Sequence, residues 1–186
     1  DGKFVVLKSL KPELRGIPMY EHLLRKEYEI GYDLDHPNIC QIQRFGKFIG
    51  LGNCIVMQWI DGVTLRSMLG HLDAGQERKV IDGICDAMEY IHSKQIVHRD
   101  LKPEHIIITH NGQNVKLIDF GASKQQSTVG GATMSTGISY TNGFAPSEQM
   151  AQSYDKFGPW TDFYSLGATV YKLLTNQDPP SVSDLS

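Results

Sequence analysis

Two aspartates in the second half of the chain stand among residue types that suit phosphate and metal chemistry. Asp100 lies in the segment HRDLKPEH, and Asp119 opens the segment DFG. A carboxylate can accept a proton from a hydroxyl group or bind a hard cation such as Mg²⁺. Lys8 and Lys102 add positive charge, and His105 adds a ring nitrogen. Together these side chains could hold a multiply charged anion and a metal ion, provided that the fold brings them into one cleft.

Local patterns predict the elements that must position these residues. The segment KFVVLKSL is rich in β-branched residues and predicts a strand with Lys8 near its end. Pro18 suits the start of a helix and Pro37 disfavours its continuation, so a helix is expected over 18–34. Apolar residues recur at helical spacing in two further segments, 75–94 and 160–175. The other expected strands lie at 105–109, at 115–119 and, as a pair, within 38–62.

The order of these elements predicts the fold class. Strands dominate the first part of the chain, and helices dominate the rest. Such an order indicates an α+β protein with a small β-rich lobe followed by a mostly helical lobe. The segment 122–143 is rich in Ser, Thr and Gly and is expected to be a mobile loop.

The composition is typical of a soluble globular protein. Of 186 residues, 40% are hydrophobic and 21% are charged. A net charge of −3 gives no general attraction to nucleic acid or to an anionic membrane. No apolar run is long enough to span a membrane. The three cysteines, Cys40, Cys54 and Cys85, lack CxxC spacing and are expected to be reduced and buried, as in a cytoplasmic protein.

Six sequence features occur in one order along the chain: VVLK at 5–8, Glu27 in the first helix, HRDLKP at 98–103, DFG at 119–121, APSE at 145–148 and TDFYSLG at 161–167. This set resembles the protein kinase family. The segments GFAPSEQ and TDFYSLGATVYKLLT are similar to those of bacterial eukaryote-like (Hanks-type) Ser/Thr kinases. The resemblance runs through essentially the whole chain. It implies a bilobal kinase fold, with residues 1–60 as a partial N-lobe and 61–186 as a partial C-lobe.

The resemblance implies an ATP site between the lobes. Lys8 would bind the α- and β-phosphates and would be held by an ion pair with Glu27. Glu29 is a rival for this role, but a residue two positions along a helix lies on a different face. The adenine ring would meet hinge and sandwich residues that could equally be plain core: Val6, Met57, Gln58, Ile60 and Ile107.

Further roles follow from the same resemblance. Asp100 would accept or orient the proton of the substrate hydroxyl, and Lys102 would steady the transferring phosphoryl group. Asp119 would bind Mg²⁺. Asp162, in TDFYSLG, is expected to be a buried carboxylate that binds the backbone of the HRD turn.

Arg99 implies control by phosphorylation of the loop, because a guanidinium group binds phosphate through two parallel hydrogen bonds. Ser135 and Thr136 are the favoured acceptors. Thr141 matches the substrate-side threonine of the family.

His105 departs from the family pattern, which has an asparagine that supplies an amide oxygen to the second Mg²⁺. Imidazole nitrogen suits transition metals better than magnesium. Three readings stay open: one metal ion is weakened while Asp119 carries the other, His105 binds a softer ion such as Mn²⁺, or the domain binds nucleotide with little turnover. Gly31 also departs, since the family usually has a bulky side chain there. The glycine is expected to leave space and loosen the first helix, so that the Lys8–Glu27 pair forms only on activation.

The expected function is transfer of the ATP γ-phosphate to Ser or Thr of a protein substrate, with ATP and Mg²⁺ or Mn²⁺ as cofactors. The Gly-rich loop of the family and an Arg partner for Glu148 have no counterpart, so a longer cytoplasmic protein is expected, with a membrane anchor elsewhere left open. No contact with nucleic acid or membrane is expected within this segment. A pseudokinase, which binds nucleotide or acts as a scaffold, is the alternative. A small-molecule kinase is a third possibility.

Overall fold

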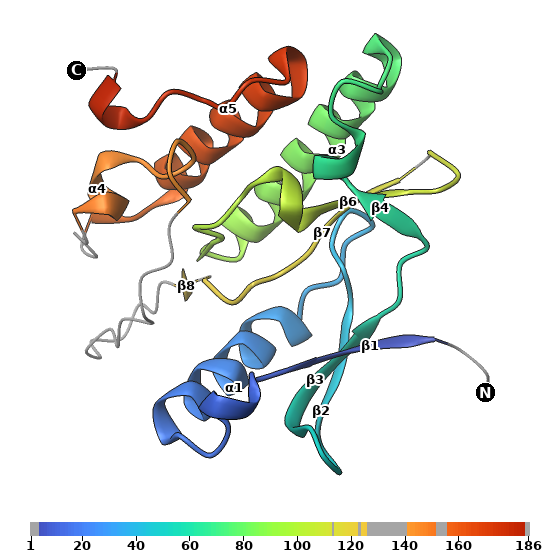
Figure 1. The fold of residues 1–186 in the computed structure, drawn as a ribbon, viewed down its shortest axis with the longest axis vertical. Coiled ribbons are helices and arrows are strands. Elements are labelled where there is room, and N and C mark those ends of the chain that lie inside the picture. Colours follow the sequence, from blue (N-terminus) through green and yellow to red (C-terminus); the bar gives the residue numbers. More distant parts are fainter. Residues whose placement is uncertain (1–3, 113, 123, 126–140, 152–155, 185–186) are drawn as a thin grey trace.

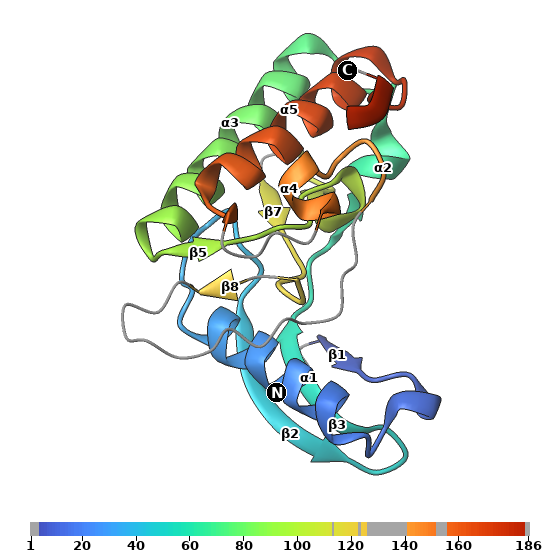
Figure 2. The same ribbon diagram turned by 90° about the vertical axis from the view of Figure 1, so that its left-hand side faces the viewer.

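The structure, a computed structural model, describes residues 4–112, 114–122, 124–125, 141–151 and 156–184. Its elements form a mixed α+β protein with small antiparallel sheets (Figure 1). One three-stranded sheet and helix α1 (Pro18–Tyr32) lie at one end of the molecule. Helices α3 (Ala74–Ser93) and α5 (Pro159–Thr175) lie side by side at the other end (Figure 2). The α+β class expected from the order of elements is confirmed.

The first sheet consists of β1 (Val5–Ser9), β3 (Gly52–Gln58) and β2 (Ile42–Phe48), in that order. The central strand β3 is buried from Cys54 to Met57, which explains its uninterrupted apolar sequence. In the register of β1 and β3, Lys8 lies opposite Ile55. Helix α1 covers the sheet and turns Leu24 and Glu27 inward. The sheet and this helix therefore place Lys8 and Glu27 toward one another.

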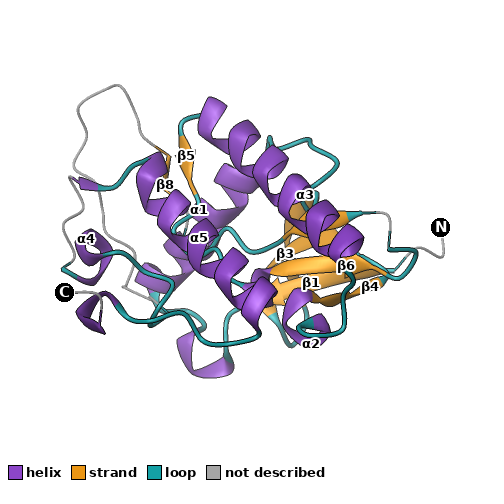
Figure 3. Ribbon diagram, turned by 90° about the horizontal axis from the view of Figure 1, so that it is seen from above, coloured by secondary structure: helices purple, strands orange, loops and turns teal. Residues whose placement is uncertain are grey.

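The second part of the fold is built on α3. A capping box begins this helix: the Asp73 carboxylate accepts a hydrogen bond from the Gln76 N–H at 2.8 Å, and the Gln76 side chain accepts one from the Asp73 N–H at 2.9 Å. Helix α3 lies over the strands in the view of Figure 3. Its buried stripe packs against β7 (Val115–Leu117), which belongs to a sheet with β6 (Ile106–Thr109) and β4 (Gly62–Thr64). The members of this stripe belong to the largest hydrophobic core: Val80, Ile84, Ala87, Met88 and Ile91.

Shorter elements complete the described fold: η1 (Pro12–Leu14), α2 (Leu65–Met68), β5 (Ile96–Val97), η2 (Pro103–His105), β8 (Lys124–Gln125), α4 (Ser147–Met150) and η4 (Val182–Asp184). The HRDLKPEH segment connects β5 to β6, and Asp119 follows β7 closely. Because β6 and β7 are antiparallel partners, the segment that leads into β6 and the segment that follows β7 lie at the same end of this strand pair.

The three long helices agree with their predicted positions, although α1 ends at Tyr32 rather than at residue 34. The prediction of three buried cysteines is wrong for Cys85, which is exposed because it lies outside the buried stripe of α3; Cys40 and Cys54 are buried. Most of the predicted loop at 122–143 lies outside the described residues. None of the described helices is long and apolar enough to cross a membrane.

Candidate active site

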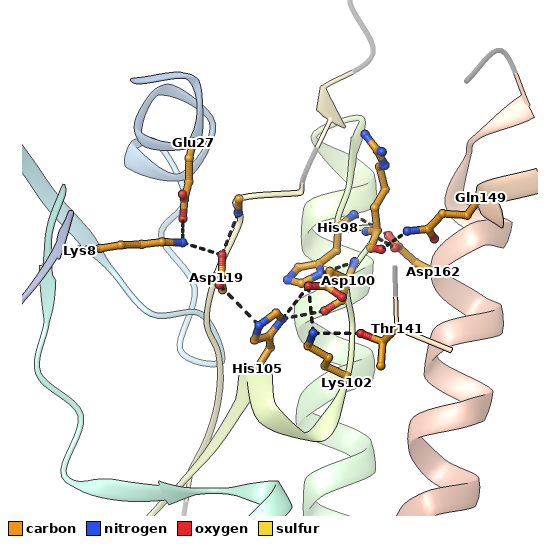
Figure 4. Close-up of polar contacts among 12 residues, drawn as sticks. Lys8, Glu27, His98, Asp100, Lys102, His105, Asp119, Thr141, Gln149 and Asp162 are labelled. Carbon is orange, nitrogen blue, oxygen red and sulfur yellow. Dashed lines mark hydrogen bonds and ion pairs between the residues drawn. The ribbon is translucent and has the colours of Figure 1, made fainter. Parts of the chain in front are cut away.

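A lysine and two carboxylates form the centre of the site (Figure 4). The Lys8 ammonium, from β1, donates to Glu27 Oε1 of α1 at 2.6 Å and to Asp119 Oδ1 at 2.7 Å. The Glu27 side chain is 6% exposed, whereas those of Lys8 and Asp119 are 31% and 33% exposed. Three segments that are distant in the sequence thus meet at one partly open ion-pair cluster.

The pKa values of these groups show how the charge is distributed. Burial opposes the charge on Lys8, but the carboxylates of Glu27 and Asp119 outweigh it and raise the pKa of Lys8. Burial also opposes the charge on Asp119, yet Lys8 and the Gly121 N–H hold the pKa of Asp119 well below its usual range. Burial raises the pKa of Glu27, and Lys8 offsets only part of that effect. Asp119 is therefore the carboxylate that keeps its charge most firmly.

The environment of Gly31 corrects an expectation from the sequence. Gly31 was expected to leave open space in α1 and to keep the Lys8–Glu27 pair apart. In the structure the pair is formed, and the side chain of Ile42 fills the space beside Gly31. The absence of a side chain at this position thus allows close packing rather than leaving a cavity.

The segment after β5 supplies the second group of polar side chains. Lys102 Nζ donates to Thr141 Oγ1 at 3.0 Å and lies 3.4 Å from Asp100 Oδ2. His105 lies between the two aspartates: Nδ1 is 3.5 Å from Asp100 Oδ2, and Nε2 is 3.5 Å from Asp119 Oδ2. Asp100 and Asp119 therefore border the same space, on either side of one imidazole ring.

The protonation of the His105 ring is partly determined by its neighbours. Nδ1 lies 2.8 Å from the backbone oxygen of Asp100. A carbonyl oxygen can only accept, so Nδ1 carries a proton and donates it. In the neutral ring, Nε2 then holds a lone pair directed toward Asp119. In the charged ring, Nε2 carries a second proton and pairs with that carboxylate.

A buried carboxylate holds the turn that carries Asp100. Asp162, which is fully buried, accepts hydrogen bonds from the backbone N–H groups of His98 and Arg99, each at 2.8 Å. The His92 ring lies 2.8 Å from the same carboxylate. Arg99 has a φ of 71°, in the left-handed region that non-glycine residues rarely adopt. The predicted structural contact of Asp162 is present, and it offsets the strain of this turn.

An apolar cleft of about 430 Å³ opens beside the ion-pair cluster. All five residues expected around an adenine ring line it, with Lys8 and Asp119 at its polar end: Val6, Met57, Gln58, Ile60 and Ile107. The cleft is also lined by Cys40, Trp59 and Ile118, which were not predicted from the sequence as site residues. Ile118 could have been found because it directly precedes Asp119, but no local signal marks Cys40.

Of the residues proposed to control activity, the structure describes Arg99 and Thr141. The Arg99 side chain is buried, and its guanidinium carbon lies 4.7 Å from the centroid of the Phe157 ring. Thr141 contacts Lys102, as described above. Ser135 and Thr136 lie outside the described residues.

The residues present fit a cation held jointly with a phosphate-bearing ligand. No three His, Cys, Asp or Glu side chains of the described part of the chain converge to hold a metal ion by themselves. Mg²⁺ needs fewer, because it is usually bound by one or two carboxylates together with substrate phosphates and water. Lys8 and the Gly121 N–H engage Asp119 Oδ1, while Oδ2 faces His105. Asp119 Oδ2 is therefore the oxygen suited to such a cation.

Comparison with known proteins adds a family to this geometry. The family described as protein kinase domain matches residues 1–184. A probable serine/threonine-protein kinase of Streptomyces coelicolor is 33% identical and aligns with 98% of this chain. Serine/threonine-protein kinase PknB of Mycolicibacterium smegmatis is 30% identical over 97% of the chain, and PrkC of Bacillus subtilis is 31% identical over 94%. The chain spans only 28%, 29% and 27% of the length of these relatives, respectively.

Proposed function

The chain belongs to the protein kinase family, and we propose that it forms the central part of a kinase domain that transfers the γ-phosphate of ATP to Ser or Thr of protein substrates. In this proposal the fold is bilobal, with residues 1–60 in the N-lobe and 61–186 in the C-lobe. The cleft between them binds ATP. A cytoplasmic location agrees with the free state of all three cysteines.

One observation carries the proposal. Lys8 bridges Glu27 and Asp119 at the polar end of an apolar cleft, and Asp100 lies across His105 from Asp119. Phosphoryl transfer depends on placing charged groups around a triphosphate more than on covalent chemistry. A cationic amine, a firmly ionised carboxylate and a second carboxylate around one space match that requirement.

Each residue then has a physical role. The apolar walls of the cleft exclude water from the adenine ring, and Lys8, oriented by Glu27, binds the phosphates. A bound Mg²⁺ ion would neutralise charge on the triphosphate, and Asp119 is the residue to hold it. Asp100 orients the substrate hydroxyl and takes up its proton. General-base catalysis of this kind raises a reaction rate by about 10²–10⁴-fold. Lys102 contacts Thr141 and lies beside Asp100, so it would steady the phosphoryl group during its transfer.

His105 bears on the choice of metal. His105 Nε2 lies 3.5 Å from Asp119 Oδ2, the oxygen that would hold the cation. Nitrogen at this place weakens a site for Mg²⁺ and favours Mn²⁺. We therefore propose Asp119 as the principal metal ligand and His105 as the residue that shifts metal preference.

Phosphorylation of Ser135 or Thr136 is the control that we propose, with Arg99 as a binding partner for the phosphate. Its support is the sequence pattern together with the position of Arg99 next to Asp100. Mass spectrometry of the full-length protein after incubation with ATP would identify the modified residue. Phosphate found only on other residues would contradict this assignment.

A labelled-ATP assay of the full-length protein tests the proposed activity. The protein is incubated with a generic protein substrate and Mg²⁺ or Mn²⁺ in parallel, and Asp100→Asn serves as the inactive control. We expect transfer that depends on Asp100 and is faster with Mn²⁺. Tight nucleotide binding without transfer in either metal would instead favour the pseudokinase, in which His105 has disabled the site.

A further inference from the structure

Gly31 occupies an unfavourable place for a glycine. It is buried in the last turn of α1, where glycine is the poorest helix former apart from proline. Its backbone is helical and does not need the left-handed conformation that would explain a glycine. The reason for its presence must therefore lie in packing.

The neighbour of Gly31 is Ile42 of β2. A Cβ atom at position 31 would collide with Ile42 Cδ1 and would lie 3.4 Å from Ile42 Cγ1. Ile42 is 3% exposed and packs with Leu24, Ile55 and Met57 in the core beneath α1. Branching at Cβ restricts the first side-chain torsion of Ile42, and the buried packing around Ile42 limits how far its terminal methyl group can move aside.

This contact lies one helical turn from the ion-pair residue. Glu27 and Gly31 are four residues apart and therefore share the inward face of α1. Ile42 pairs with Met57 in the sheet, and Met57 pairs with Val6, two residues before Lys8. The distance between α1 and the sheet at Gly31 thus helps to set the distance between Glu27 and Lys8.

We propose that Gly31 is a positioning residue for the Lys8–Glu27 ion pair, because its lack of a side chain lets Ile42 hold α1 close to the sheet. A side chain at position 31 pushes this turn outward and separates Glu27 from Lys8. The catalytic consequence rests on the proposed kinase function, whereas the packing itself does not.

The test moves one methyl group from the strand to the helix in the full-length protein. Gly31→Ala adds the colliding Cβ, and Ile42→Val removes the Cδ1 atom that it meets. The double variant Gly31→Ala/Ile42→Val therefore keeps the total volume unchanged. Gly167→Ala in α5 is the matched control, because a Cβ there meets no atom within 4 Å. It tests the gain in helix propensity without a packing conflict.

Amide hydrogen exchange of the α1 segment without nucleotide is the first readout, with α3 as the internal reference. Alanine favours a helix over glycine by about fivefold, so Gly167→Ala should slow exchange in α5 by that factor. We expect Gly31→Ala to accelerate exchange in α1 by roughly threefold to tenfold, since overpacking outweighs propensity. The double variant should exchange in α1 no faster than the wild type. Global unfolding of Gly31→Ala that the double variant reverses would support the proposal equally.

Phosphotransfer is the second readout. Misplacement of Glu27 should lower kcat/KM in Gly31→Ala by roughly tenfold or more, and the double variant should restore it. Slower exchange in α1 with unchanged kcat/KM for Gly31→Ala would show that the glycine only loosens the helix and would overturn the proposal. Failure of the double variant to recover would overturn it as well. If the wild-type protein transfers no phosphate, the proposed function fails while the exchange measurement still decides the role of Gly31.

Discussion

Replacement of Lys8 by methionine removes the shared partner of two carboxylates while keeping most of the buried side-chain volume. The Lys8 ammonium lies 2.6 Å from Glu27 Oε1 and 2.7 Å from Asp119 Oδ1. Asp119 is one-third exposed and keeps the Gly121 N–H as a donor. Glu27 is 6% exposed, so its charge becomes the more costly of the two to keep buried when Lys8 is removed.

The structure sets the size of the effect. Removing one partner of a buried ion pair costs about 3–5 kcal/mol. Lys8 is 31% exposed, and water therefore screens part of the interaction. We expect a loss of about 2 kcal/mol in the free energy of unfolding near neutral pH, after this discount. For a domain of this size, such a loss lowers the Tm by about 4–8 °C.

The loss should depend on pH in a defined direction. Burial already raises the pKa of Glu27, and without Lys8 it rises further. In the unfolded chain Glu27 titrates near its ordinary pKa of about 4.3. Between these two pKa values the folded state binds more protons than the unfolded state, so the free energy of unfolding falls as pH rises. The variant should match the wild type only below about pH 4, where Glu27 is protonated in both the folded and the unfolded state, and should then diverge by at most about 1.4 kcal/mol per pH unit as pH rises.

Thermal unfolding of the full-length protein across this pH range measures both effects. Lys8→Met/Glu27→Gln is the matched control, because a neutral amide replaces the buried carboxylate that has lost its cationic partner. It should recover most of the lost stability and show no added pH dependence, while phosphotransfer stays absent. A Lys8→Met variant as stable as the wild type at every pH would refute the reasoning that Lys8 compensates a buried charge.

Three further predictions concern other parts of the site. Asp162→Asn should cost about 3 kcal/mol in urea denaturation, because a buried carboxylate that accepts backbone N–H groups loses its charge; a loss below about 1 kcal/mol would contradict the role of Asp162 in holding the turn. Burial raises the pKa of the Cys40 thiol to about 11, so iodoacetamide near about pH 8 should modify the exposed Cys85 and spare Cys40. Peptide mass spectrometry checks this, and labelling of Cys40 would count against it. His105→Asn should raise the phosphotransfer rate with Mg²⁺ relative to Mn²⁺; no gain would speak against His105 as the cause of a weakened magnesium site.

The long helices could be predicted because each carries its own local signal. Pro18 begins α1, and apolar residues repeat at helical spacing in α3 and α5. The prediction that Lys8 and Asp119 belong to one site came from motif order and resemblance rather than from any local pattern, and their direct contact was not predicted. Lys8 lies on β1 and Asp119 follows β7, a strand of another sheet, so only the tertiary arrangement of the two sheets brings Lys8 Nζ within 2.7 Å of Asp119 Oδ1.

Contacts between distant segments account for what the sequence did not predict. Cys40 lines the cleft because its backbone pairs with Leu117, far along the chain. Gly31 suggested a loose helix because its partner Ile42 belongs to another element. The direction of the His105 ring depends on the Asp100 backbone oxygen, which only the turn geometry places at 2.8 Å.

The central claim is that Asp100 acts on the hydroxyl group of a protein substrate while ATP occupies the cleft beside Lys8 and Asp119. A single-turnover assay with saturating labelled ATP compares the wild type with Asp100→Asn, and quenching of Trp59, which lines the cleft, reports nucleotide binding. The account predicts equal ATP affinity and a phosphotransfer rate that is lower in the variant by about 10²–10⁴. Equal transfer rates in the two proteins would contradict it.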